Sequence, residues 1–289
     1  MGNINILPIE VERSLKSFIA KKFEEDNLRD FFQNSLLRDD VLELLDRYCT
    51  VVYYPIENEG NNGFHVTGIP FVDGTRHNFV FINTAQTIEK QVFTAAHELG
   101  HIWNVDEYII SELNLDSSTE MREMIINRFA AILLIPNENF STAVRAGLKA
   151  LGNNDGKTIT FENLLKLVVT LMNQFYVPMN AIVLRLVETS FFNPDFAELF
   201  LGYDKIPEDF FTQRGKELVI EMGYTKFIQP SRKKWIEGLA EKLDIVDREG
   251  LVSPSKIAHM REMFDLKCTT TTVPELDISL DTQEGLDIE

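Results

Sequence analysis

Two histidines and a glutamate stand close together in AAHELGH, residues 95–101. His97 and His101 are four residues apart, so on a helix their imidazoles share one face, about one turn from each other. Both rings can then reach a single zinc ion, at about 2.0–2.1 Å from each coordinating nitrogen. Glu98 follows the first histidine, where its carboxylate contacts water at the metal instead of the metal itself. The pattern H-E-x-x-H is typical of a zinc site in which the glutamate serves as general base.

A catalytic zinc ion takes three protein ligands and leaves the fourth position for water. The remaining histidines, His65, His77 and His259, do not extend the motif to H-E-x-x-H-x-x-G-x-x-H. We therefore expect a carboxylate as third ligand. Glu123 begins the pattern E-x-x-x-N, which ends at Asn127, and these two side chains share a helix face. The carboxylate can bind zinc while the amide hydrogen-bonds a ligand histidine, as the partners of metal-bound histidines commonly do.

Other acids compete with Glu123 for this role. Glu120 lies one turn earlier on a similar face and is the main alternative. Four more acids are weaker candidates because we expect them on a loop between residues 106 and 120. They are Asp106, Glu107, Glu112 and Asp116.

Short strands and helices are expected around these side chains. Runs of β-branched and aromatic residues predict strands, and apolar residues at helical spacing predict helices. The helix with the two histidines begins near Thr84 or Thr87 as N-cap, and the helix with Glu123 stops at Pro136. The expected strands are 49–54, 64–72 and 78–83, and helices are expected within 8–46 and at 87–105, 119–134, 161–174 and 179–192.

The segment FTAAHELGHIW (93–103), followed by EMIINRFAAILLIP (123–136), resembles the ImmA/IrrE metallopeptidases of bacterial mobile elements, prophages and stress-response loci. That family pairs a HELGH-type helix with E-x-x-A-N-x-F-A-x-x-L-L-x-P, and here Ile126 replaces the usual alanine. The resemblance covers residues 45–190, approximately. It implies an α+β, zincin-like fold, with a small twisted sheet packed on the active-site helix and a mainly helical C-terminal extension. By analogy, residues 78–83 are expected to form the edge strand of the cleft and to bind a peptide by strand addition.

The resemblance also implies an activity and a partner. The activity is peptide hydrolysis with zinc held by His97, His101 and Glu123, and with Glu98 as the catalytic base. The partner is a specific protein substrate, a DNA-binding transcriptional repressor or an antitoxin-like protein of a mobile element or stress-response locus. A further side chain would help zinc to stabilise the oxyanion.

His77 and Tyr108 are the two candidates for that side chain. Their spacing from the H-E-x-x-H motif does not decide between them.

The net charge of −17 disfavours nucleic acid as a partner and is compatible with a basic protein. Residues 161–192 resemble a helix-turn-helix segment, but the second helix offers only Arg185 as a basic residue, so we expect it to have a packing role. The run SRKKW, residues 231–235, is the one basic cluster beside an aromatic residue, and we expect a solvated helix start there.

The cysteine content and the hydropathy indicate a location. Cys49 and Cys268 are far apart and in no metal-type spacing, which fits a reducing cytoplasm. The first 25 residues show no signal-peptide pattern, and no apolar run reaches 18 residues, so neither secretion nor a membrane span is expected.

The sequence predicts three regions. The metallopeptidase domain covers 1–192, with a helical N-terminus at 1–46, a catalytic core at 47–150 and the helix-turn-helix-like segment at 160–192. A helical accessory region follows at 193–268, and an acidic flexible tail at 269–289. Two alternatives to a peptidase are a non-hydrolytic zinc-containing protein that sequesters a regulator, and a DNA-binding regulator that uses residues 161–235.

Overall fold

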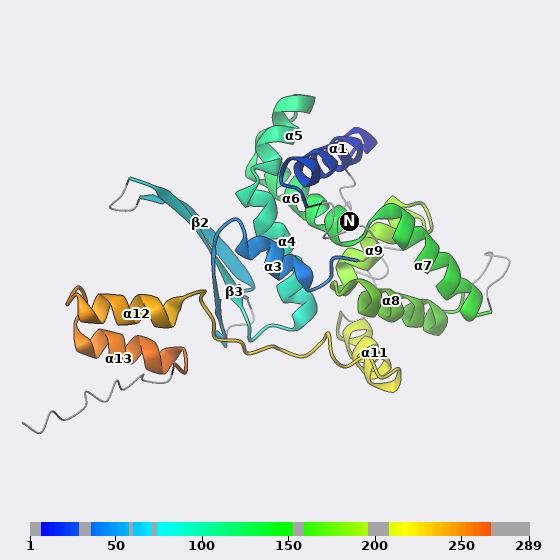
Figure 1. Ribbon diagram of the computed structural model, residues 1–289. Helices are drawn as coiled ribbons and strands as arrows, with labels where there is room; N and C mark the ends of the chain where they lie inside the picture. The colour runs from blue at the N-terminus through cyan, green and yellow to red at the C-terminus, as the bar shows by residue number, and fades with distance from the viewer. Residues whose placement is uncertain are drawn as a thin grey trace, which may run out of the picture. The chain divides into compact units, whose positions relative to one another are not determined.

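The structure is a computed structural model (Figure 1) that describes residues 7–28, 36–57, 60–70, 74–152, 159–195 and 208–266. The chain divides into two compact units, Met1–Glu237 and Gly238–Glu289. The acidic tail expected at 269–289 and Cys268 lie outside the described residues. The domain boundaries expected at 192 and 268 stay predictions.

Three strands form one mixed sheet: β1 (Thr50–Tyr54), β2 (Gly63–Pro70) and β3 (Arg76–Asn83). β3 lies in the middle, parallel to β1 and antiparallel to β2. The expectation that residues 78–83 form an edge strand is therefore wrong. Their consecutive buried residues are typical of a strand covered on both sides, because a strand with one solvated face alternates. Within the described ranges no strand pairs with the far side of β2, which is thus the edge.

The edge formed by β1 is partly covered by residues 227–235, which we call the strap. Tyr53 and Trp235 exchange two backbone hydrogen bonds, each with an N···O distance of 2.9 Å. Nζ of Lys233 lies 4.1 Å from the centre of the Tyr53 ring. The helix start expected at 231–235 is wrong, because these residues are not helical and Trp235 pairs with β1.

The helix that carries H-E-x-x-H is α4 (Ile88–Ile102), and it packs against β2 and β3 (Figure 1). The prediction of a helix at 87–105 is confirmed within a few residues. A shorter helix, α3 (Asp40–Asp46), packs on α4 and on β1. The apolar side chains buried between α4 and the sheet include Val80, Ile82, Val92, Ala95, Ala96 and Leu99. This packing holds His97 and His101 in the C-terminal half of α4.

The first amides of α4 are capped by the strap. Thr87 is the N-cap residue, but its side chain accepts no hydrogen bond from the helix. The N–H groups of Ile88 and Glu89 instead donate to the carbonyls of Gln229 and Phe227, at 3.0 and 3.1 Å. A helix N-terminus needs partners for these amides, and here they come from a segment about 140 residues further along the chain.

A second helix, α5 (Val105–Leu113), follows α4 directly. The sequence prediction of a loop over this stretch is wrong. Asn104 and Asn114 bound α5 with φ angles of 53° and 51°, a left-handed conformation that asparagine tolerates better than most residues. These two residues break the chain into separate helices without a long connection.

The helix with the E-x-x-x-N pattern is α6 (Thr119–Leu134), which begins and ends as predicted. Ser118 caps it by accepting a hydrogen bond from a backbone amide of the first turn. α6 packs directly on α4. At the contact, a Cβ on Gly100 would lie 2.9 Å from Cδ1 of Phe129 and 3.1 Å from Cδ1 of Ile126. Glycine at this position therefore lets the two helices come close enough for their polar side chains to meet.

The described part of the first unit contains five further helices. α1 packs on α5 and α6, and α8 packs on α7, α9 and α11. The helix α7 was not expected from the sequence, whereas α8 and α9 were. Arg185, the basic residue of α9, is fully buried, in agreement with a packing role. These helices are α1 (Ile9–Glu25), α7 (Asn137–Ala150), α8 (Phe161–Phe175), α9 (Met179–Glu188) and α11 (Glu208–Glu221).

The described part of the second unit contains α12 (Leu239–Arg248) and α13 (Pro254–Met263), which pack on each other. The fold is α+β: a three-stranded mixed sheet packed on helices, with further helices towards the C-terminus. The predicted class is confirmed. Over the described ranges no single helix is long and apolar enough to cross a membrane, although α8 and α9 together meet that test as a pair bent by 106°.

Candidate metal centre

Three side chains from α4 and α6 bring potential ligand atoms together. Nε2 of His97 lies 3.2 Å from Nε2 of His101, and the Glu123 carboxylate oxygens lie 3.4 and 3.6 Å from these two atoms. Ligands held tetrahedrally at about 2.0–2.1 Å from an ion lie roughly 3.3–3.4 Å from one another. The spacing of the three side chains therefore fits a divalent ion.

Asn127 fixes the orientation of one ligand. Its Oδ1 lies 3.0 Å from Nδ1 of His97. An amide oxygen can only accept, so the imidazole carries its proton on Nδ1 and leaves the lone pair on Nε2, the atom that faces Glu123. Such a partner raises the basicity of a ligating histidine and limits rotation of the ring.

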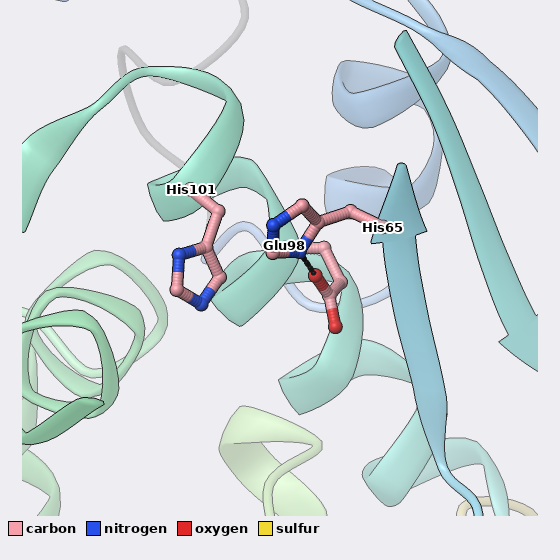
Figure 2. Close-up of side chains that lie close together, drawn as sticks. All are labelled: His65, Glu98 and His101. Carbon is pink, nitrogen blue, oxygen red and sulfur yellow. Dashed lines mark hydrogen bonds and ion pairs between the residues drawn. The ribbon is translucent and has the colours of Figure 1, made fainter. Parts of the chain in front are cut away.

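The carboxylate of Glu98 is held by a histidine from the sheet (Figure 2). Nδ1 of His65, on β2, lies 2.6 Å from Oε2 of Glu98. The ring of His65 also lies 4.5 Å from the ring of His101, centre to centre. His65, Glu98 and His101 thus form a second group of potential ligands that shares one histidine with the first. The 2.6 Å distance is that of a charge-assisted hydrogen bond, and it is too short for two neighbouring ligands of one ion.

His65 is the side chain that sequence reasoning missed. Its spacing from the motif argues only against a role as third ligand. No local sequence signal indicates this contact, because residues 65 and 98 meet only through the pairing of β2 with β3 and the packing of β2 on α4. The two residues named as oxyanion candidates lie elsewhere: Nε2 of His77 is 2.9 Å from Oγ1 of Thr75, and Tyr108 packs on the ring of Phe18, 5.0 Å away.

The acids that competed with Glu123 do not join either group of potential ligands within the described residues. Asp106 forms an ion pair with Arg122, at 2.5 Å. Glu112 accepts a hydrogen bond from Ser14. Glu120 is exposed in the first turn of α6.

The surroundings shift the pKa values of His101 and His65 in opposite directions. Burial lowers the pKa of His101, and the neighbouring His97 and His65 lower it further. The hydrogen bond to Glu98 raises the pKa of His65. A lowered pKa keeps His101 in the neutral form that binds metals, since a proton competes with the ion for the same lone pair.

A mixed sheet beside a helix with H-E-x-x-H, joined by a carboxylate from the next helix, defines a domain of the metallopeptidase class. The model of the IrrE N-terminal-like domain, Peptidase_M78, matches residues 47–187. This part of the chain is a domain of the ImmA/IrrE metallopeptidase family, as the resemblance in the sequence predicted.

Two other comparisons add little to this assignment. A search of curated proteins gives no significant match. Among solved structures, the chain is similar to a Mycobacterium tuberculosis transcriptional regulator, with 18% identity and a TM-score of 0.37. The match covers 62% of this chain and 52% of that chain, so the chain spans about half the length of that protein.

Proposed function

We propose that the chain is a zinc-dependent endopeptidase that cleaves one or a few specific proteins. The observation that carries this proposal is the set of ligand-atom distances of 3.2, 3.4 and 3.6 Å among His97, His101 and Glu123, with Glu98 beside them. A divalent ion bound there would polarise the scissile carbonyl and lower the pKa of water. Glu98 would accept the proton of the attacking water at Oε1, because Oε2 is hydrogen-bonded to His65. It would then deliver this proton to the leaving amine.

The edge of β2 offers the substrate a place to pair. An extended peptide can add to an exposed strand through backbone hydrogen bonds, and alternate side chains then face the site. On β2, His65 faces α4, whereas Phe64 and Val66 point to the opposite face and are 50% and 43% exposed. A peptide paired along β2 would therefore run past Glu98 and the three ligands.

The substrate we propose is a DNA-binding repressor or an antitoxin-like protein of a mobile element or stress-response locus, cleaved in the cytoplasm. The family supports this choice by analogy. The net charge of −17 supports it by electrostatics, because an acidic surface attracts the basic face of a DNA-binding protein. The same charge disfavours direct binding of this chain to DNA.

The test is proteolysis by the full chain loaded with zinc. The wild type and Glu98→Gln would be incubated with a proteome-derived peptide library, and each would be co-expressed with the product of the neighbouring gene. Glu107→Gln, an exposed acid on α5, is the matched control. We expect cleavage by the wild type and the control, and a loss of about 10²–10⁴-fold in Glu98→Gln, with equal zinc content in all three.

Two results would contradict the proposal. Cleavage by Glu98→Gln at the wild-type rate would remove Glu98 from the chemistry. A wild type that binds zinc and its partner but hydrolyses nothing would leave a non-hydrolytic binding protein.

A further inference from the structure

The sheet contributes one side chain to the site, and its position is set by a close approach between strand and helix. Gly63 and His65 lie on the same face of β2, two residues apart, above Thr94 and Glu98, which are four residues apart on α4. A Cβ on Gly63 would lie 2.7 Å from Cγ2 of Thr94 and 2.6 Å from the carbonyl oxygen of Phe81. Only glycine lets β2 come this near, and His65 reaches Glu98 as a result.

The strand changes register immediately after this point. The pairing of β2 with β3 shifts between Val66 and Ile69. Gly68 takes a φ of 67°, and its N–H donates to Oδ1 of Asn78 at 3.0 Å. Bulges of this kind bend a strand and re-aim its side chains, and they are common beside active sites. The register that directs His65 at α4 is thus fixed on both sides, by Gly63 before it and by the bulge after it.

We propose that His65 is a positioning residue that holds the Glu98 carboxylate for catalysis, an inference that rests on the proposed function. Nδ1 of His65 contacts Oε2 of Glu98, and both side chains are largely shielded, with 32% and 7% of their surfaces exposed. A free glutamate side chain samples several rotamers, and a hydrogen bond to one oxygen restricts the other to one direction. Oε1 is then the oxygen that accepts the proton.

This arrangement also couples substrate binding to the base. His65 belongs to β2, the edge strand on which a peptide would pair. Because an unpaired edge strand is more mobile than a paired one, pairing should restrain β2 and, through His65, Glu98. We therefore expect loss of His65 to lower the turnover number and to leave the zinc affinity nearly unchanged.

The test compares His65→Phe, which cannot donate, with His65→Gln, whose amide N–H can reach the carboxylate. His259→Phe, an exposed histidine in the second unit, is the matched control. On a peptide that the wild type cleaves, we expect kcat to fall about 10–100-fold in His65→Phe, with KM changed less than about twofold. His65→Gln should recover part of the rate, and zinc affinity should stay within about threefold of the wild type in all variants.

A double-mutant cycle with acetohydroxamate gives a readout that needs no substrate. With a metal held by His97, His101 and Glu123, this probe would offer the metal its oxygen atoms, and the Glu98 carboxylate would accept a hydrogen bond from its hydroxyl group. We expect His65→Phe and Glu98→Gln each to weaken its binding, and the double variant to be no weaker than Glu98→Gln alone.

Additive losses in the cycle would overturn the proposal, as would a His65→Phe variant that matches the wild type or loses zinc. If the wild type cleaves no peptide, the proposed function fails, and the cycle alone decides whether His65 positions Glu98.

Discussion

Glu123 and Glu120 lie one turn apart at the start of α6, and only the first has its carboxylate beside both histidines of α4. We predict that Glu123→Gln lowers zinc affinity by on the order of 100-fold or more, because a neutral amide is a poor metal ligand compared with a carboxylate. Glu120→Gln should bind zinc like the wild type. Competition with a chromophoric chelator measures both. Equal losses of zinc affinity in the two variants would show that the negative charge of α6 matters for binding and that Glu123 is not a specific ligand.

The local part of the site could be predicted at the residue scale, and the long-range part could not. His97, His101, Glu123 and Asn127 follow from i, i+4 spacing on two helices, which fixes a shared face in advance; their roles as ligands and as the partner of a ligand stay predictions. His65 depends on strand register, and a shift by one residue would turn it to the other face of the sheet. Spacing within the sequence contains no information on that register.

At the scale of elements, the contact between α4 and α6 depends on Gly100. We predict that Gly100→Ala costs roughly 1–3 kcal/mol of stability and weakens zinc binding, because the new Cβ would push against the buried ring of Phe129 and separate the helices. The control is Gly215→Ala on α11. Among the described residues, its Cβ would meet only the terminal methyl of Met179, at 2.9 Å, and that flexible side chain can move.

Thermal unfolding and zinc titration compare the two glycine variants. Gly215→Ala should be neutral or slightly stabilising, since alanine is favoured over glycine inside a helix. A Gly100→Ala variant that keeps the wild-type stability and zinc affinity would refute the idea that close packing at Gly100 assembles the site.

Elements with clear stop signals were predicted better than those without them. α6 covers Thr119–Leu134, the expected range, and ends before Pro136, which the sequence marks as a stop. The acidic residues of α5 predict a loop, whereas the structure forms a helix there that buries Val105 and Ile109. The central place of β3 follows from the pairing of whole strands, which composition does not specify.

At the scale of the whole molecule, a buried charge network joins helices from distant parts of the chain. Glu12 of α1 accepts hydrogen bonds from Arg128 of α6, at 2.8 Å, and from Asn137 of α7, at 2.7 Å. Arg128 and Arg185 both pair with Glu188 of α9. Removing one member of such a buried group leaves an uncompensated charge, which typically costs about 3–5 kcal/mol.

This network predicts a dependence of stability on pH. Burial alone would raise the pKa of Glu12, but hydrogen bonds from Lys16 and Asn137 and the charges of Arg128 and Arg185 lower it from 4.5 to about 2. Because the pKa is lowered in the folded state, the stabilisation is complete above pH 4.5 and is lost as the pH falls towards 2. The shift corresponds to roughly 3 kcal/mol.

Urea unfolding between pH 7 and 3 should show a shallower pH dependence of the unfolding free energy in Glu12→Gln, while the exposed neighbour variant Glu10→Gln should keep the wild-type slope. An unchanged slope in Glu12→Gln would exclude this network as the source.

The matched family domain, residues 47–187, leaves out α1, α3, Glu188 and the strap, on all of which the first unit depends. Without α1, the buried Arg128 and Arg185 lose Glu12, and without the strap, the first amides of α4 and the edge of β1 lose their partners. Each loss is a sizeable fraction of a typical folding free energy of about 5–15 kcal/mol.

We therefore predict that a fragment of residues 47–187 shows no cooperative thermal unfolding by circular dichroism. A fragment of residues 1–237, the first compact unit, should unfold cooperatively within a few degrees of the full chain, which serves as the control. Cooperative unfolding of the 47–187 fragment near the same temperature would show that this domain folds without α1, α3, Glu188 and the strap.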